Sequence, residues 1–353
     1  MTEQQTQTLP FRFSGNGGEY FKIWIVNLIL NILTLGIYSA WAKVRKNRYF
    51  YGNTSLDNAA FEYHATPMMI LKERLIAVAA LLICVLLLKF FPTVGLLFTA
   101  ILALLIPWVI WRSLQFNARM VSYRNVRFGF YGTLKALYTI FVLIPLLTII
   151  IGAILLLDIE ISKPGDLDIF DLVIIFDLVM TGVMFSAFIV TLMYPYIKVL
   201  LAGYYINNRQ YGQGQFSAQL SAIKYYRIYL NLTGWTFLFY IFLPLLFFIP
   251  FSLWGRAFLE ANVKHHLLNR TKLDDVLELH SNIKVGKLLD IYTINILLVG
   301  VTFGLAYPWA IIRLKKYKIE STSATIKGDI AQYVNQQQKA QSALSEEING
   351  WSL

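Results

Sequence analysis

Polar side chains inside apolar stretches are the residues of this chain that could do chemistry. Asn27 and Asn31 stand one helical turn apart near the start, and Asn295 lies in a similar stretch near the end. An amide inside hydrocarbon needs a hydrogen-bonding partner, which a neighbouring helix usually supplies. Two interpretations stay open: the amides line a path for a substrate or ion, or they hold helices together. The pattern favours the second.

A Thr-x-Gly sequence follows the amides in both stretches. Thr34 precedes Gly36, and Thr302 precedes Gly304. One interpretation is a broken helix whose freed backbone groups bind an ion. The other, which is more frequent in membrane proteins, is that small residues let two helices approach closely.

Asp177 is an acidic residue inside an apolar segment. An intramembrane carboxylate is a candidate for coupling to protons or cations. The uncharged run Leu178–Ile197 that follows is already 20 residues long, which is enough to cross a bilayer. That length favours a second interpretation, in which Asp177 lies at a hydrated helix end on the external side of the membrane.

Aromatic and basic residues recur together where apolar stretches end. In three places an arginine follows a tryptophan by four positions, and a second aromatic residue follows the same tryptophan by eight positions. A ring at headgroup depth with a basic side chain one turn later is typical of the inner-leaflet surface, and the second ring indicates a helix that continues past the membrane. We predict lipid-headgroup contact by Trp41, Lys43, Arg45, Trp108, Arg112, Trp309 and Arg313. The later aromatic residues are Tyr49, Phe116, Tyr204 (after Tyr196) and Tyr317.

The sequence shows no arrangement of residues for catalysis. It has no Gly-x-Ser-x-Gly turn, no paired catalytic carboxylates and no Cys/His nucleophile pair. The four histidines are scattered and the single cysteine, Cys84, lies in an apolar run, so we predict neither a metal site nor a cofactor. We therefore expect that the protein is not an enzyme.

The composition is that of a membrane protein. Of 353 residues, 57% are hydrophobic and 14% are charged, whereas charged residues make up about 25% of soluble domains. The net charge of +11 does not require a nucleic acid partner, because positively charged cytoplasmic loops produce such an excess. Membrane lipids are the expected partners. The first ten residues lack the features of a signal peptide, so the first span is expected to direct insertion.

Apolar segments of bilayer length predict an all-α, polytopic membrane helix bundle of about seven transmembrane helices. The run 228–255 contains two prolines, so it is one span or two elements. The predicted spans are Ile23–Ala42, Leu71–Phe91, Val94–Trp111, Ala136–Leu157, Leu178–Ile197, Ile228–Gly255 and Ile291–Ile312. They form a transmembrane domain (23–320) between a polar N-terminal segment (1–22) and a polar C-terminal tail (321–353).

The distribution of lysine and arginine predicts the orientation of these spans. Segment 158–171 carries five acidic residues and one lysine, so it is expected outside the cell. Segment 256–290 fits poorly, because its predicted place is also outside although it holds six lysine or arginine residues. The C-terminus is expected in the cytoplasm. The basic segments that indicate the cytoplasmic side are 43–74, 112–135, 198–227 and the tail after Ile312.

A stretch near the start of the chain recurs near its end. Gly18–Thr54 aligns without a gap on Gly286–Thr322, with 11 identities in 37 positions. Chance would give about two or three identities at ordinary residue frequencies. The matched residues include the amide, the Thr-x-Gly sequence and the Trp-x3-Arg sequence. The repeat indicates that the helices arose by duplication of a helical unit.

The first copy of the repeat resembles a known family. The run Thr34-Leu35-Gly36-Ile37-Tyr38-x-x-Trp41, after Phe13-Ser14-Gly15-x-Gly17-x-Glu19-Tyr20-Phe21, is similar to the YjgN-type bacterial inner-membrane proteins, a domain of unknown function numbered 898. Asn269-x-Thr271-x-Leu273-Asp274 echoes Asn53-Thr54-Ser55-Leu56-Asp57. The resemblance implies a multi-pass protein of the bacterial inner membrane, and it brings no catalytic residues.

Two classes of function remain open. The duplication favours a transporter of a small molecule or ion around a midplane site, whereas the scarcity of intramembrane charge favours a non-transport scaffold or lipid-binding envelope protein. The sequence leans toward the transporter, with an unidentified small molecule or ion as partner. It does not indicate the substrate, the coupling ion or the oligomeric state.

Overall fold

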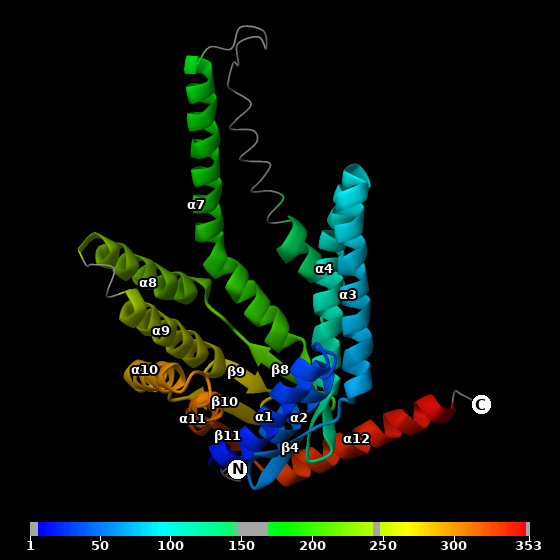
Figure 1. The fold of residues 1–353 in the computed structure, drawn as a ribbon. Coiled ribbons are helices and arrows are strands. Elements are labelled where there is room, and N and C mark those ends of the chain that lie inside the picture. The colour runs from blue at the N-terminus through cyan, green and yellow to red at the C-terminus, as the bar shows by residue number, and fades with distance from the viewer. Residues whose placement is uncertain (1–5, 144–145, 147–168, 243–247, 351–353) are drawn as a thin grey trace.

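Short strands separate pairs of helices along the chain. The computed structural model describes residues 6–143, 146, 169–242 and 248–350 (Figure 1). The strands are β1 (Thr6–Pro10), β2 (Arg12–Phe13), β3 (Thr54–Leu56), β4 (Ala59–Tyr63), β5 (Val121–Tyr123), β6 (Val126–Phe130), β7 (Arg209–Tyr211), β8 (Gly214–Ala218), β9 (Thr271–Leu273), β10 (Leu277–Ser281) and β11 (Thr322–Lys327). The helices are α1 (Gly17–Leu33), α2 (Ser39–Gly52), α3 (Pro67–Phe90), α4 (Pro92–Arg119), α5 (Leu134–Tyr138), the π-helix η1 (Thr139–Leu143), α7 (Ile169–Asn207), α8 (Ala222–Phe242), α9 (Phe248–Leu268), α10 (Val285–Val301), α11 (Tyr307–Glu320) and α12 (Ile330–Gly350).

The predicted all-α bundle of about seven helices is wrong, because the chain contains an eleven-stranded antiparallel sheet. Most of these strands are only three or five residues long and lie in the more polar segments between apolar runs. A hydropathy window of about 19 residues averages such strands into the flanking loops. The period-two alternation that marks a strand extends over too few residues to stand out there.

The chain repeats one unit, a helical hairpin followed by a β-hairpin. Helices α1–α2 lead into β3–β4, α3–α4 into β5–β6, the α5–α7 region into β7–β8, and α8–α9 into β9–β10. In each of these β-hairpins a strand of three residues precedes a strand of five. Helices α10–α11 lead into β11, which pairs with β1 in place of a following strand.

The sheet returns to its starting point. Its strand order is β1-β11-β10-β9-β8-β7-β6-β5-β4-β3-β2, and its two end strands are consecutive in the chain. The linking residue Phe11 donates its backbone N–H to the Thr322 carbonyl (3.0 Å). The N-terminal segment 6–13 therefore joins the last strand to β3, and we call the resulting closed set of hairpins the ring.

Tight turns with left-handed backbone join the paired strands. Asp57 and Asn58 have φ of 46° and 57°, and Arg124 and Asn125 have φ of 46° and 64°. Two consecutive residues with positive φ are the signature of the turn that matches the twist of a β-hairpin. These turns lie at the end of the ring away from the helices, because each strand is joined to its helix at the other end.

Apolar side chains fill the ring. Successive hairpins contribute Leu56, Tyr123, Tyr211 and Leu273 to one buried cluster. Three phenylalanines from the longer strands, Phe61, Phe128 and Phe216, pack against this cluster and line a cavity of about 90 Å³. The ring is therefore a packed core, and its side chains leave little open space along its axis.

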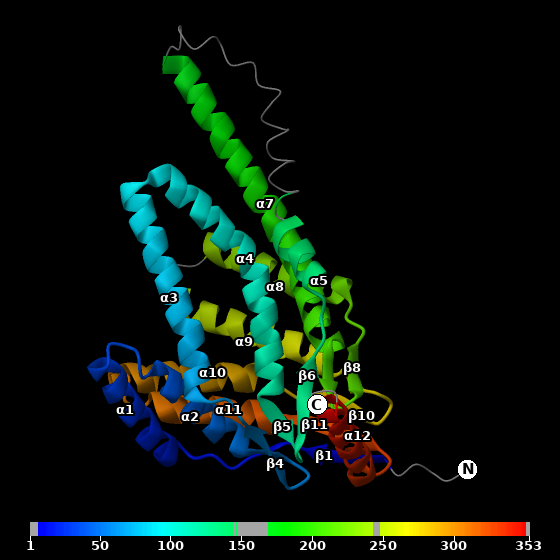
Figure 2. The ribbon, with the colours of Figure 1, turned by 90° about the vertical axis from the view of Figure 1, so that its right-hand side faces the viewer.

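Helix α12 closes the end of the ring that carries the turns (Figure 2). Its apolar residues Ile330, Tyr333 and Val334 cover the ring core. Its amides bond the turns: Gln337 Oε1 accepts from the Gln213 N–H (2.7 Å), and Gln338 Nε2 donates to the Arg124 carbonyl (2.7 Å). The face of α12 that meets the ring is thus both apolar and polar.

The helical hairpins leave the ring together and diverge with distance from it (Figures 1 and 2). Neighbouring hairpins touch through the pairs α1–α11, α9–α10, α7–α8 and α2–α3. Among the described residues, only α4 has the length and apolar composition of a helix that could cross a membrane.

Several predicted spans have different boundaries in the structure. Ile23–Ala42 and Ile291–Ile312 are each divided between two helices by a tight turn, and Ile228–Gly255 is divided between α8 and α9. Leu178–Ile197 lies within α7. The predicted span Ala136–Leu157 lies mostly outside the described residues. Hydropathy alone does not separate one long helix from a hairpin with an apolar tip.

Candidate functional site

The two Thr-x-Gly sequences form the tips of the first and last helical hairpins. The Thr34 hydroxyl donates to the Leu30 carbonyl (2.7 Å) and accepts from the Tyr38 N–H (3.0 Å). Thr302 makes the matching bonds to Leu298 (2.6 Å) and Ala306 (2.9 Å). Gly36 and Gly304 have φ of 89° and 92°, a backbone conformation that favours glycine. Each sequence therefore forms the turn between the two helices of its hairpin.

Large apolar side chains cover these tips. Leu35 is 94% exposed and Phe303, at the matching position, is 98% exposed. Leu33, Ile37 and Val301 beside them are also exposed. A contiguous apolar surface of this kind is typical of a membrane or partner contact.

The two hairpins match in their element boundaries. Helix α10 begins and ends 268 residues after α1, which is the offset of the sequence alignment. The bounds of α11 correspond to those of α2 in the same register. Both α1 and α10 start at the ring, after β2 and β10, so both run away from it.

The predicted intramembrane amides have different surroundings. Asn295 Nδ2 donates to the Ala310 carbonyl (2.9 Å), and its Oδ1 accepts from Arg313 (3.2 Å), which joins α10 to α11. Asn27 is 7% exposed, and its Oδ1 has no hydrogen-bond partner among the described residues. Asn31 lies one turn later, and its Oδ1 is also buried with no partner among the residues that the structure describes. The structure thus assigns Asn295 a role within its own hairpin.

Asp177 is exposed on α7, in the third turn of the helix. The external loop predicted over 158–171 lies mostly outside the described residues, which resume at Ile169. The structure therefore does not bring Asp177 together with the amides of α1 and α10.

The tryptophan and arginine residues predicted at the membrane surface lie on α2, α4 and α11. Arg112 stacks on Trp108 and Trp111 at about 5.8 and 5.7 Å from the ring centroids. Trp309 packs against Phe21 of α1 (5.1 Å between centroids). Trp41 stacks on Tyr38 (5.9 Å), whereas Lys43 and Arg45 are on the exposed surface of α2.

The later aromatic residues hydrogen-bond the segment just before the first helix of their own hairpin, and we call these contacts ties. Tyr49 accepts from the Asn16 N–H (2.8 Å), at the N-terminus of α1. Tyr317 accepts from the Lys284 N–H (2.8 Å) before α10, and Tyr204 donates to the Thr133 carbonyl (2.9 Å) before α5. Each tying residue stands five positions before a three-residue strand or, for Tyr317, before β11. Phe116 occupies the same place but has no hydroxyl.

His266 forms the corresponding tie for α8 and α9, although no sequence pattern indicated it. It stands five positions before β9, and its Nε2 accepts from the Ser221 N–H (3.1 Å) at the start of α8. Burial, together with the positive charges of Lys224 and Arg270, lowers the pKa of His266, so the neutral ring accepts this bond. The distance from the strand start, rather than residue type, would have identified it.

A cluster of charges joins α9, α10 and α11 near the ring. Glu260 of α9 accepts from Lys264 (2.9 Å) and from Lys318 of α11 (2.5 Å), and Tyr292 donates to its second oxygen. Arg256 lies over the Tyr292 ring (5.3 Å). No sequence pattern pointed to this cluster, because its members come from separate helices.

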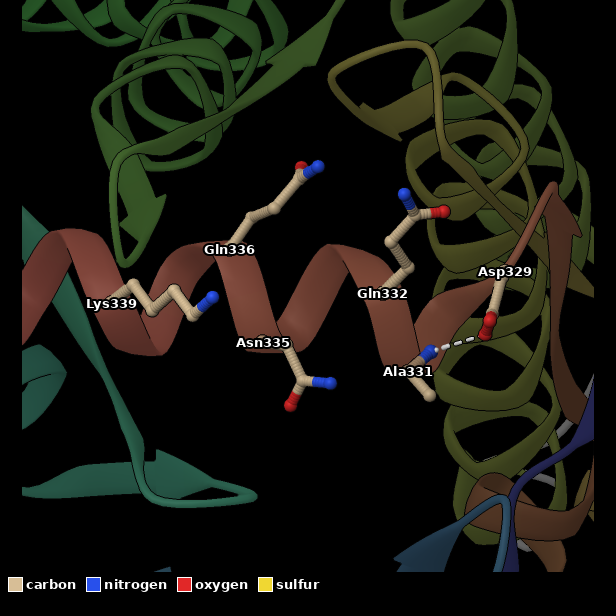
Figure 3. A pocket seen from close by; sticks show the side chains of 6 residues that line it. All are labelled: Asp329, Ala331, Gln332, Asn335, Gln336 and Lys339. Atoms are coloured by element: carbon tan, nitrogen blue, oxygen red, sulfur yellow. Dashed lines mark hydrogen bonds between the residues drawn. The ribbon is translucent and has the colours of Figure 1, made fainter.

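The outer face of α12 carries a shallow hollow. Gln332, Gln336, Asn335 and Lys339 line it, and Asp329 accepts from the Ala331 N–H (2.7 Å) at the helix start (Figure 3). These side chains point away from the ring, opposite Tyr333 and Gln337. The lining holds one carboxylate, one ammonium group and several amides. Among the described residues, no group of three histidine, cysteine or acidic side chains could hold a metal ion.

Comparison with known proteins identifies relatives along nearly the whole chain. Inner membrane protein YjgN of Salmonella typhimurium (strain LT2) is 26% identical over 371 aligned positions, which cover 90% of this chain and 88% of the relative. The protein of that name from Escherichia coli K12 is 32% identical over 150 positions, or 42% of this chain and 37% of the relative. No solved structure matches. The family described as "Bacterial protein of unknown function (DUF898)" matches residues 8–249 and 238–351, and the chain belongs to this family.

Proposed function

We propose that the protein is a lipid-organising scaffold of the bacterial inner membrane, which inserts its helical hairpins into the bilayer from one side. The observation that supports this proposal most is that the hairpins share one face of the ring and end in exposed apolar tips. Lipid would cover Leu35 and Phe303, which no other part of the described chain covers. The names of the relatives support the location.

The hairpins would reach different depths. Helix α4, which has the length and apolar composition to cross a membrane, has 28 residues and is about 42 Å long, which exceeds the roughly 30 Å of hydrocarbon in a bilayer. Helix α1 has 17 residues, or about 25 Å, and its partner α2 meets Lys43 only a turn after the tip. The α3–α4 hairpin would cross the membrane, and the first and last hairpins would enter one leaflet.

The basic residues support a cytoplasmic ring. Segment 256–290 disagreed with the orientation of seven alternating spans, because it was basic but assigned to the outside. In the ring, its strands β9 and β10 lie beside β8 and β11, on the same side as the other basic segments. A membrane in which the hairpins enter and leave on the cytoplasmic side satisfies the positive-inside rule for all of them. The C-terminus is then cytoplasmic.

The contacts of Asn295 support a scaffold over a transporter. This amide was a candidate for lining a path between the two repeats, but it bonds Ala310 and Arg313 within one hairpin. Both repeats start at the ring and run outward, so they do not form the inverted pair of many transporters. The hairpins also expose large apolar side chains along their length, such as Leu81 and Trp235, which lipid would cover.

Cysteine labelling in cells tests the proposed arrangement. Single cysteines would replace the exposed turn residues Asn58, Asn125, Gln213 and Asp275 in a Cys84→Ser background. All four thiols should react with a membrane-impermeant maleimide only after the inner membrane is opened. Labelling of Asp275→Cys from the periplasm, as seven alternating spans require, would refute the proposal.

The hairpin tips provide a second measurement with the same reagents. Leu35→Cys and Phe303→Cys should stay unreactive in opened membranes and become reactive in detergent at denaturing concentration, because hydrocarbon shields them. Asn58→Cys serves as the reactive control. Rapid labelling of the tips in intact membranes would show that they are covered by neither lipid nor protein.

A further inference from the structure

We propose that the junction of α2, α9 and α11 binds the phosphate of an anionic phospholipid headgroup through Lys46, Lys264 and Lys315. This inference rests on the proposed function, because it assumes that the helix ends next to the ring lie at the membrane surface. The site is separate from the tryptophan and arginine residues that the sequence indicated.

The first observation is an excess of positive charge from three helices. Lys264 and Lys318 share a single carboxylate, Glu260, whose side chain is 20% exposed. Lys315 is one turn before Lys318 on the same side of α11. Its ammonium lies over the ring of Phe50 on α2, and Lys46 is one turn before Phe50 on that helix. One carboxylate therefore faces four lysines, so most of the positive charge in the cluster has no counterion in the described part of the protein.

The second observation is that the cluster is held in place by contacts other than ion pairs. The Lys315 ammonium lies 5.6 Å from the ring centroid of Phe50, and Lys318 lies 5.8 Å from that of Tyr292. Tyr292 also donates to Glu260, which fixes the carboxylate from the α10 side. Aromatic rings stabilise nearby cations and restrict their positions. The lysines are thus arranged before any ligand arrives.

The position of the cluster indicates the class of ligand. Lys46 and Lys315 lie seven and eight residues, or about two turns, past the starts of α2 and α11, toward the ring. Anionic phospholipids give the cytoplasmic leaflet a negative surface potential, and each lysine near it contributes about 1 kcal/mol of attraction. A phosphate at this junction would reduce the mutual repulsion of Lys46, Lys264 and Lys315, and it would link the first hairpin to the last.

Thermal unfolding of the purified full-length protein in detergent tests this site. A ligand that binds the folded state raises the melting temperature. Dioleoyl-phosphatidylglycerol added to the micelles should stabilise the protein more than phosphatidylcholine, and more than inorganic phosphate alone. Lys46→Gln with Lys315→Gln should raise the half-saturating phosphatidylglycerol concentration about 30-fold.

Two matched variants make the result specific. Lys22→Gln with Lys316→Gln removes the same charge from exposed positions on α1 and α11 and should leave the response unchanged. Lys46→Arg with Lys315→Arg keeps the charge and should retain most of it. Equal losses in the two glutamine variants would overturn the proposal, because they would reflect surface charge alone.

The remaining outcomes are also decisive. An equal shift with inorganic phosphate would make the site one for free phosphate and overturn the lipid assignment. Absence of any shift with phosphatidylglycerol would overturn the site. The measurement is made in detergent and does not depend on sidedness, so it separates this inference from the labelling result on which the proposed function depends.

Discussion

The first and last helical hairpins have equivalent helix boundaries but differ in the hydrogen bonds of their buried amides. Their helices begin and end at equivalent positions, and their tips have the same hydrogen bonds and the same left-handed residues. In contrast, Asn295 bonds Ala310 and Arg313 within its hairpin, whereas Asn27 Oδ1 has no partner in the described chain. The turn and the ties are thus common to both hairpins, whereas the hydrogen bonds of the buried amide are not.

The difference also shows how the two hairpins fit together. Gly17 begins α1 where Val285 begins α10, and Gly17 lies against Trp309 of the last hairpin. A Cβ atom at Gly17 would overlap the indole ring of Trp309 at Cδ1. The small residue in the first helical hairpin therefore makes room for the tryptophan of the last one, and this contact joins the two helical hairpins.

The largest expected effect comes from closing this space. Gly17→Val should destabilise the protein by about 2–3 kcal/mol, because the indole must move away from α1. Thermal unfolding in detergent would measure the loss. Gly18→Val is the matched control, because a Cβ atom there meets only Asn16 Oδ1 at 3.4 Å. Equal losses in the two variants would show that helix propensity, and not the contact with Trp309, is responsible.

The amides are expected to show the next effect. Asn295→Leu should cost about 2 kcal/mol, because it leaves the Ala310 carbonyl and the Arg313 guanidinium without this partner. Asn27→Leu should change stability by less than about 1 kcal/mol or increase it, because a buried amide oxygen with no partner among the described residues is already unfavourable. Thermal unfolding in detergent compares the two variants. A larger loss for Asn27→Leu than for Asn295→Leu would contradict this difference between the copies.

The ties should contribute less. Tyr317→Phe and Tyr49→Phe each remove a hydroxyl that bonds the start of a helix, at about 1 kcal/mol apiece. Phe116 occupies the same place in the second hairpin without a hydroxyl, so packing of the aromatic side chain is enough to hold that hairpin together. Phe116→Tyr, compared with wild type by thermal unfolding, should add little or no stability. A gain of about 1 kcal/mol would contradict this expectation.

The sequence predicted the repeated helices better than the sheet that connects them. The bounds of α10 and α11 follow those of α1 and α2 by 268 residues, which is the offset of the alignment of Gly18–Thr54 with Gly286–Thr322. The likeness of Asn53-Thr54-Ser55-Leu56-Asp57 to the segment ending at Asp274 reflects the matching β-hairpins β3–β4 and β9–β10, whose first strands are too short to show a strand pattern.

The remaining errors have physical causes. Short strands are stabilised by neighbours distant in the sequence, such as β3 beside β2 or β1 beside β11, which no local window contains. The charge cluster around Glu260 likewise depends on three helices meeting in space. His266 was overlooked because a histidine replaces tyrosine in that tie.

The smallest expected effect distinguishes the last β-hairpin from the others by its response to acid. Glu278 of β10 accepts from Lys272 of β9 (2.8 Å) and Lys327 of β11 (2.9 Å), and these bonds lower the pKa of its carboxyl from 4.5 to about 2. The unfolded chain therefore binds the proton more readily, so the stabilisation is complete above pH 4.5 and is lost as the pH falls toward 2. Thermal unfolding of wild type should show a slightly steeper loss across this interval than Glu278→Gln, by less than about 1 kcal/mol, because both lysines are largely exposed. Identical pH profiles would mean that the two ion pairs do not hold β9, β10 and β11 together in solution.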